Sequence, residues 1–227
     1  MAKYKTELHC HSKDASGCSH ESAEGIVEKY LAAGYTSIVL TNHFCPDSMD
    51  NDWMAKVAQK YDAYDKLVNA ADGRLNILMG MEFRFFDDSN DYLVFGFDRE
   101  YLESRPDILK ERIRDFVKKG REHGIMTIHA HPFRFGRLTV NPADLDGIEV
   151  FNGHSGHNSN NDIAYMWAQK YGKIMTSGTD HHDPHHIPNG GILTDEPVTS
   201  VTQLIEILKS GNYELIMDPI PPKPSKK

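Results

Sequence analysis

The chain has 227 residues, of which 39% are hydrophobic and 26% are charged, so it can bury the core of one domain. Its formal net charge of −8 argues against a general polyanion-binding protein, because nucleic-acid modules normally present a basic face. Its three cysteines form no CxxC pair and cannot all close into disulfides, which argues against a disulfide-stapled extracellular fold.

The ends of the chain give no sign of a membrane or secretory segment. The first residues lack the apolar core of a signal peptide, and no run approaches the roughly 18 apolar residues of a membrane span. We therefore expect a cytoplasmic protein with no membrane partner. We expect residues 1–218 to form a single domain and residues 219–227, rich in proline and lysine, to form a flexible tail.

The first half of the chain alternates predicted strands and helices. A strand from Tyr4 runs into His9-Cys10-His11, and its period of two sends both histidines to one face. A helix beginning at Ser22 leads to a buried strand over residues 35–40, which is followed by Asn42-His43. Spacing predicts a long helix over residues 50–71, then a strand over residues 75–86 that contains Glu82.

The alternation then breaks once and resumes. A polar turn over residues 87–91 leads straight into a strand over residues 92–97, with no room for a helix between the two strands. We expect further helices over residues 106–123, 160–171 and 201–209, and further strands over residues 125–128, 148–151, 173–177 and 213–217. This order favours a barrel of parallel strands over separate α and β regions.

Residues able to bind metal follow the predicted strands. They lie at the C-terminal ends of strands or one step beyond: His9, His11, His43, Glu82, His131, Asn152, Asp180 and His182. In a barrel of β/α units these ends meet on one face, where active sites lie, whereas satisfied core histidines would be scattered through strand middles and helices. The pattern therefore predicts a metal site, and mixed imidazole and carboxylate ligands suit zinc, manganese or iron.

Five ordered motifs carry a family resemblance. They are His9-Cys10-His11, Asn42-His43, Gly80-Met81-Glu82, Ala130-His131-Pro132 and Asp180-His181-His182. From His9 to about Leu208 the chain resembles the polymerase and histidinol phosphatase (PHP) superfamily of metal-dependent phosphoesterases. The resemblance implies an α/β fold, a distorted (β/α)7 TIM-like barrel of the PHP type, with its active site at the C-terminal ends of the strands.

The resemblance also implies which residues bind which ion. His9 and His11 would bind a first metal ion with Asp180, and Glu82 would bridge it to a second ion held by His131. His43 and His182 match the ligands of a third ion. The family usually places Asp or His five or six residues after the second histidine of the first motif, whereas this chain has Ser16 and Gly17 there. Asp14 and His20 are nearby but out of register, so we expect two to three divalent ions.

These ligands suggest a chemistry for the site. With neutral imidazoles, Glu82 and Asp180 leave a local excess of roughly two positive charges beside two divalent ions, which suits an anionic substrate. Two adjacent ions can also lower the pKa of a bridging water and hold phosphoryl oxygens during attack by the resulting hydroxide. We therefore take Glu82, Asp180 and His182 as the candidate catalytic residues.

Cationic residues close to these motifs are candidates for binding substrate. Arg84, Arg134 and Arg137 could hold phosphate, because a planar guanidinium binds its oxygens bidentately; the alternative is an arginine in a surface salt bridge. His154 could protonate a leaving group or close over the substrate, or it is an ordinary loop histidine. Cys10 should point away from the metals, and no cysteine at zinc-like spacing supports a thiolate ligand from Cys18 or Cys45.

The leading hypothesis is a phosphatase that hydrolyses a small phosphate monoester of a metabolite, such as histidinol phosphate, a nucleotide or a sugar phosphate. One alternative is a phosphodiesterase or nuclease of the same family, although the acidic balance disfavours a nucleic-acid partner. Another is a hydrolase of the amidohydrolase or TatD-like type, which usually lacks the Asp-x-His ending and the early Asn-His. A third is a non-catalytic binding module stabilised by metal.

Overall fold

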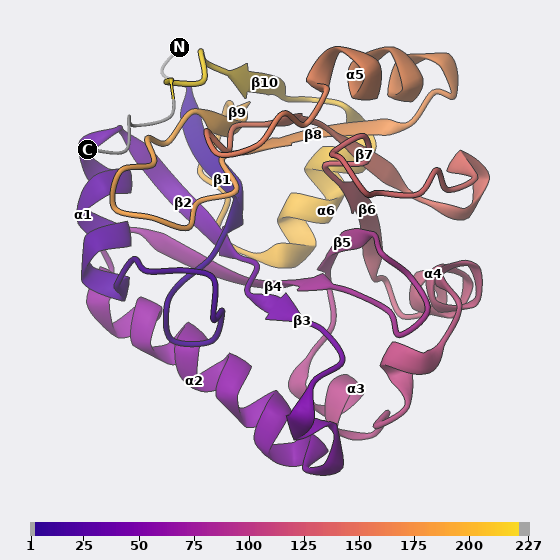
Figure 1. Ribbon diagram of the computed structural model, residues 1–227. Coiled ribbons are helices and arrows are strands. Elements are labelled where there is room, and N and C mark those ends of the chain that lie inside the picture. Colours follow the sequence, from indigo (N-terminus) through magenta and orange to yellow (C-terminus); the bar gives the residue numbers. More distant parts are fainter. Residues whose placement is uncertain (1–2, 223–227) are drawn as a thin grey trace.

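A curved sheet forms the wall of the molecule and closes nearly into a barrel (Figure 1). The structure is a computed structural model, and it describes residues 3–222. Along the sheet the strand order is β10-β9-β1-β2-β4-β5-β6-β7-β8, and β3 pairs with β4. The strands are β1 (Tyr4–Cys10), β2 (Tyr35–Leu40), β3 (His43–Phe44), β4 (Asn76–Phe83), β5 (Asp91–Phe95), β6 (Met126–Ala130), β7 (Gly147–Asn152), β8 (Ile174–Gly178), β9 (Gly190–Thr194) and β10 (Glu214–Met217).

Strands β5 and β9 interrupt the parallel order of the sheet, and β9 is antiparallel to both β1 and β10. Strands β1, β2 and β4 are parallel neighbours, and so are β6, β7 and β8, but β5 is antiparallel to both β4 and β6. The cause is the short turn between β4 and β5, because strands joined without a crossover helix must run in opposite directions. The predicted break in alternation is confirmed, as is the distorted barrel, whereas an all-parallel wall is wrong.

The barrel closes between β8 and β1. Cys10 and His181 form an isolated parallel bridge, in which His11 N donates to His181 O at 2.9 Å and His181 N donates to His9 O at 3.3 Å. This close approach requires Gly178, because a Cβ at that position would lie 2.4 Å from the Cβ of His9. The segment that follows β8 is therefore held directly beside the histidines that end β1.

Helices cover the outside of the sheet and one of its ends. They are α1 (Ala23–Ala32), α2 (Trp53–Ala71), α3 (Arg99–Glu103), α4 (Ile113–Glu122), α5 (Asn161–Lys170) and α6 (Val201–Ser210). Helix α1 begins where Ser22 Oγ accepts a hydrogen bond from Gly25 N, and α2 begins at the Asp52 cap. Short 3₁₀ turns occupy Ser48–Asn51, Ile108–Lys110 and Pro142–Asp144.

The helix predicted over residues 106–123 is wrong in its first half. A 3₁₀ turn buries Ile108 and Leu109, and the next two residues, Glu111 and Arg112, have extended backbone before α4 begins at Ile113. The apolar residues before and after this break have helical spacing without belonging to one helix. The long helix predicted from residue 50 begins later, at Trp53, and strands β3 and β9 and helix α3 were not predicted.

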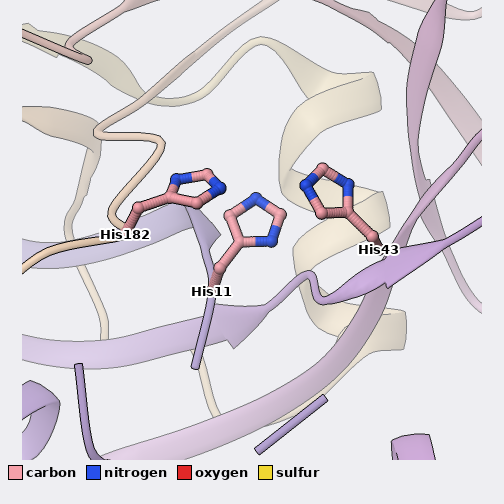
Figure 2. Close-up of side chains that lie close together, drawn as sticks. All are labelled: His11, His43 and His182. Carbon is pink, nitrogen blue, oxygen red and sulfur yellow. The ribbon is translucent and has the colours of Figure 1, made fainter. Parts of the chain in front are cut away.

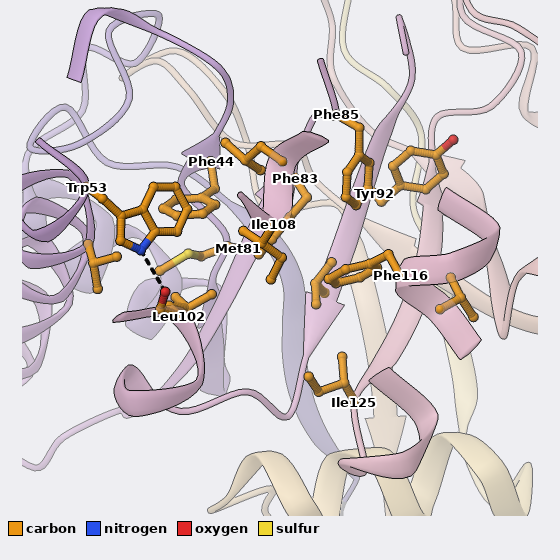
Figure 3. Packing of buried hydrophobic residues seen from close by; sticks show 14 of the residues in the cluster. Phe44, Trp53, Met81, Phe83, Phe85, Tyr92, Leu102, Ile108, Phe116 and Ile125 are labelled. Atoms are coloured by element: carbon orange, nitrogen blue, oxygen red, sulfur yellow. Dashed lines mark hydrogen bonds between the residues drawn. The ribbon is translucent and has the colours of Figure 1, made fainter. Parts of the chain in front are cut away.

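The core consists of clusters on the two sides of the sheet. Figure 3 shows the aromatic cluster between α2, β4, β5 and α4, in which the indole Nε1 of Trp53 donates to Leu102 O at 2.7 Å. A second cluster joins residues of β1 to β6 to Leu204, Ile205 and Leu208 of α6. A third packs α1 and α2 on β1 and β2 and includes Cys10, which is fully buried and turned away from the histidines, as predicted.

The C-terminal residues 219–222 carry no helix or strand, and the rest of the predicted tail, residues 223–227, lies outside the described residues. Among residues 3–222, no helix combines the length and the apolar character that crossing a bilayer requires.

Candidate metal centre

The candidate ligands meet at one end of the barrel, although they come from distant parts of the chain. His9 is the next-to-last residue of β1 and His11 directly follows that strand. His43 begins β3, and Glu82 lies near the end of β4. His131 follows β6, while Asp180 and His182 follow β8. The structure brings the predicted histidine and carboxylate ligands together, and Asn152 lies beside Asp180.

The ligand atoms form three overlapping groups: His9, Glu82 and His131; His9, His11 and Asp180; and His11, His43 and His182. In each group these atoms lie within 4.8 Å of one another. Figure 2 shows the third group, in which the ring of His11 lies between those of His43 and His182. The ring centroid of His11 is 4.5 Å from that of His43 and 4.2 Å from that of His182.

Two carboxylates connect the groups. Glu82 Oε1 lies 3.0 Å from His131 Nε2 and 3.5 Å from His9 Nε2. Its other oxygen, Oε2, lies 3.4 Å from His11 Nε2 and 2.8 Å from His43 Nδ1. Asp180 Oδ1 lies 3.3 Å from His9 Nε2 and 3.4 Å from His11 Nε2. Glu82 therefore faces all three groups, as a bridging carboxylate must.

Several of these atoms are buried without a hydrogen-bond partner. They are His9 Nε2, His11 Nε2, His43 Nδ1, Glu82 Oε2 and Asp180 Oδ1. Buried polar atoms are almost always satisfied, so a converging set of unsatisfied ones calls for an explanation. Imidazole nitrogens and carboxylate oxygens at these separations are the donors that zinc, manganese or iron(II) takes. The residues present therefore fit divalent metal ions.

The electrostatics keep the two carboxylates ionised. Burial opposes ionisation of Glu82, but His43, His9 and a hydrogen bond with His131 outweigh it, so its pKa lies well below the usual value. Burial likewise opposes ionisation of Asp180, and His9 and His182 outweigh it to hold that pKa low. The same carboxylates raise the pKa of His9 and His43 well above the ordinary imidazole value despite burial.

Two candidate ligands have a backbone that is rare for their residue types. His131 has φ of 30° and Asp180 has φ of 53°, both in the left-handed region that favours glycine. Such conformations cost free energy and persist where the surrounding structure enforces them, commonly at functional sites. His131 N donates to Glu149 Oε2 at 2.8 Å, which helps to hold one of these two turns.

Glu149 is the main residue that sequence reasoning missed. Its Oε1 lies 2.8 Å from His9 Nδ1, and its Oε2 accepts from His131 N and from Asn152 Nδ2. A carboxylate on Nδ1 fixes the tautomer of His9 that leaves Nε2 free for a metal ion. The available signal was an acidic residue in the middle of an apolar strand, Gly147–Asn152.

Glu7 and Ser16 also support the ligands. Glu7, inside β1, accepts hydrogen bonds from the backbone of His9 and Thr179 and from the hydroxyls of Thr179 and Tyr30, so it ties β1 to the segment before Asp180. Ser16, which stands where the resembled family has an acidic or histidine ligand, lies 3.4 Å from His11 Nδ1. It donates to Asn42 Oδ1 and therefore orients a ligand instead of supplying charge.

Asn152, a predicted ligand, lies beside Asp180 and is hydrogen-bonded at both ends of its amide. Its NH₂ group faces Glu149 Oε2 at 3.1 Å and Asp180 Oδ2 at 3.2 Å. Its Oδ1 accepts from His154 N and from the hydroxyl of Ser159. Both ends of the amide are thus engaged with protein groups, and the contacts orient Asp180.

The three predicted arginines all line the cavity above the ligands, which has a volume of about 490 Å³. Asp91, only 1% exposed, pairs bidentately with Arg84 at 2.7 and 2.9 Å and also accepts from Arg137. We call Arg84 and Arg137 the arginine pair. Arg134 lies apart from this pair, 3.8 Å from Asp180 Oδ2 and in contact with His157. One carboxylate thus holds two guanidinium groups on the cavity wall.

His154 and two cysteines also line this cavity. Burial lowers the pKa of His154 to about 4, so its ring is neutral at physiological pH, and its Nδ1 accepts from Gly156 N. Burial opposes ionisation of the Cys18 thiol, but contacts with His182 and His43 outweigh it and lower its pKa to about 6. Cys18 was predicted near the mouth of the site, and its contact with two candidate ligands was not.

Solved structures share this architecture, although no protein-family model and no curated protein matches the sequence. A two-domain protein from Bacteroides vulgatus that contains a predicted PHP-like metal-dependent phosphoesterase superposes with a TM-score of 0.69 and 16% identity, over 96% of this chain. The chain has the fold of the PHP-like phosphoesterases. It spans 65% of the length of that Bacteroides protein.

Two further structures show the same PHP-type fold. A candidate metal-dependent phosphoesterase from Bifidobacterium adolescentis has a TM-score of 0.59 and 18% identity, over 91% of this chain and 96% of its own. Endonuclease Q, in complex with a 27-mer duplex that carries an abasic lesion, has a TM-score of 0.67 and 12% identity. That match covers 94% of this chain and 58% of the Endonuclease Q chain.

Proposed function

We propose that the protein is a metal-dependent phosphoesterase that hydrolyses a small phosphate monoester. The observation that carries the proposal is the set of buried, unsatisfied imidazole and carboxylate atoms beneath a cavity lined by three arginines. The first feature suits divalent metal ions, and the second suits an anion with several oxygens. The PHP-type fold, found in metal-dependent phosphoesterases, supports the same assignment.

The residues of this chain would divide the work as follows. Bound ions would supply a water that ionises near neutral pH and positive charge for the phosphoryl oxygens. These ions would be held by His9, His11, His43, Glu82, His131, Asp180 and His182. Glu82 and Asp180 also limit the charge of the centre, because both carboxylates stay ionised in spite of burial.

The cavity supports a substrate with a phosphate group and a small organic part. Its volume of about 490 Å³ lies in the range of small-molecule sites. The arginine pair keeps a fixed position through Asp91, and Arg134 lies nearest to the carboxylate that borders the ions. We propose that Arg134 and the arginine pair bind the substrate phosphate and that the neutral ring of His154 contacts the leaving group.

A phosphodiester substrate is the second candidate. The fold likeness to Endonuclease Q, a protein seen with duplex DNA, favours it. The net charge of −8 disfavours a long nucleic acid, because binding to its phosphates relies on basic residues. A short diester remains compatible with the cavity and its arginines.

Hydrolysis assays on protein of known metal content test the proposal. Protein stripped with a chelator and reloaded with manganese, zinc or iron(II) is offered sugar phosphates, nucleotides, histidinol phosphate, a chromogenic diester and single-stranded DNA. We expect turnover of monoesters to exceed that of diesters. Faster cleavage of the diester would support the second candidate. If amides or lactones are also offered, their hydrolysis would support an amidohydrolase. No turnover of any substrate by protein with bound metal would support a non-catalytic module.

A matched pair of glutamate variants separates the chemistry from folding. Glu82→Gln keeps the shape of the side chain but removes the charge that faces all three ligand groups, so we expect turnover to fall by about 10³-fold or more. Glu206→Gln, at an exposed position of α6, should turn over at the wild-type rate. Normal turnover by the Glu82 variant would contradict the bridging role.

A further inference from the structure

A short turn brings Cys18 to the third ligand group. Ser19 N donates to Ser16 O at 3.0 Å, which closes a turn with Cys18 in its third position. The thiol contacts the imidazoles of both His43 and His182, and Cys18 lines the same cavity as these two rings. Cys45 lines the cavity as well, and its thiol contacts His43.

Both ends of this turn are tied to segments that carry ligands. Ser16 Oγ accepts from His43 N at 3.1 Å and donates to Asn42 Oδ1 at 2.9 Å. Ser19 Oγ lies 2.9 Å from His182 O and 3.2 Å from His11 O. The turn therefore keeps its position relative to the three histidines. A Cβ added at Gly17, next to Cys18, would meet no atom within 4 Å.

The third group offers three imidazoles and needs another donor of its own. His11 is fully buried, and its Nε2 faces the group without a hydrogen-bond partner. Glu82 is the carboxylate within reach, at 2.8 Å from His43 Nδ1, but it also faces the other two groups. Ser16 is engaged by Asn42 and His43 and carries no charge. Cys18 can supply a charged donor, and its thiol contacts two of the three rings of the group.

We propose that Cys18 binds, as a thiolate, the ion held by His11, His43 and His182. Zinc takes four ligands from imidazole and thiolate, with the sulfur at about 2.3 Å, so the sulfur would move inward to complete the set. The thiol proton leaves to solvent as the S–metal bond forms. Because thiolate is a soft ligand, this position would select zinc over manganese. The inference rests on the proposed metal centre but not on hydrolysis.

Cobalt reports a sulfur ligand directly. We would load stripped protein with Co²⁺, measure the ions bound per chain, and record the sulfur-to-cobalt charge-transfer absorption in the near ultraviolet. Wild-type protein and the control Cys45→Ser should show this band, and Cys18→Ser should lack it. A wild-type protein with three bound cobalt ions and no band would overturn the proposal, and so would loss of the band in Cys45→Ser instead.

A second measurement uses unsubstituted protein, so it does not depend on the folding of a variant. Cys18 is exposed and Cys10 is fully buried, so N-ethylmaleimide should modify Cys18 in stripped protein while Cys10 serves as the unreactive reference. Saturating zinc should slow modification of Cys18 by more than about tenfold, because a metal-bound thiolate shares its negative charge with the ion and is less nucleophilic. An unchanged rate, measured by peptide mass spectrometry with zinc at full occupancy, would refute the assignment.

These readouts remain separate from the function proposed above. A charge-transfer band in a protein that hydrolyses no phosphoester would preserve the thiolate ligand and contradict the phosphoesterase. Phosphatase activity in a protein without the band would do the reverse.

Discussion

Replacing Glu149 by Gln should weaken metal binding without unfolding the protein. The carboxylate has one oxygen on His9 Nδ1 at 2.8 Å and the other on His131 N at 2.8 Å and Asn152 Nδ2 at 3.1 Å. Every one of these contacts needs an acceptor, because a metal ion on His9 Nε2 leaves the proton on Nδ1. An amide has a single acceptor oxygen and one NH₂ group. The substitution must therefore spoil one side.

The expected loss of metal affinity follows from the two possible orientations of the Gln amide at position 149. With the amide oxygen on His9, the NH₂ group of the substituted side chain would face two donors; with the NH₂ group on His9, the ring would have to carry its proton on Nε2, where the metal binds. Loss of an outer-shell partner typically costs 10–100-fold in metal affinity, which is about 1.4–2.8 kcal/mol. We expect a loss in this range for the ion held by His9, since the substitution removes no ligand side chain.

Competition with a fluorescent chelator measures the affinity, and circular dichroism of the stripped variant measures its folding. The matched control is Glu206→Gln, which makes the same chemical change at an exposed position. The reasoning is refuted if a folded Glu149 variant binds zinc or manganese as tightly as the wild type does. Equal losses in the variant and the control would equally contradict a specific role for Glu149.

Two further predictions concern pH and the barrel seam. The pKa values of His9 and His43 are raised in the metal-free protein, so protons should compete with metal already above pH 6.5. As the pH falls, the apparent zinc affinity should decrease by about tenfold per pH unit for each proton displaced. An affinity that does not change between pH 8 and pH 6 would contradict this. Gly178→Ala should lower the free energy of unfolding in urea by about 3 kcal/mol, because the new Cβ would lie 2.4 Å from that of His9, whereas Gly17→Ala, in open space, should change it little.

The sequence could predict ligands that directly follow apolar strands. His9, His43 and Asp180 each stand where a run of strand residues ends, and parallel strands bring such ends together whatever the details of packing. The same rule placed Glu82 and His131 correctly relative to one another. It needed no knowledge of register, because these two ligands come from different strands and lie at or just beyond the strand ends.

The supporting residues were harder to predict, because their partners depend on register and on close approach. Asp91 was taken as part of a turn, yet it begins β5 and binds the arginine pair across the antiparallel strands. Glu149 acts on His9 across the interior, and Glu7 acts through the seam that Gly178 permits. An acid inside an apolar strand is a visible signal, but its partner is known only when the barrel is closed.

The distribution of charge bears on the choice between a small substrate and a polymer. The chain carries a net charge of −8, so a long nucleic acid meets repulsion over most of the surface before it reaches the cavity. Within the cavity three arginines face four carboxylates, Glu82, Asp91, Asp180 and Asp183, so the negative charge is nearly balanced there. Divalent ions would make the local charge positive. A small phosphate ester responds mainly to this local field, since screening at physiological ionic strength limits interactions beyond about 8 Å. The acidic surface therefore weakens the binding of a small ester little and that of a polymer strongly. For this reason the monoester is the favoured substrate for this cavity.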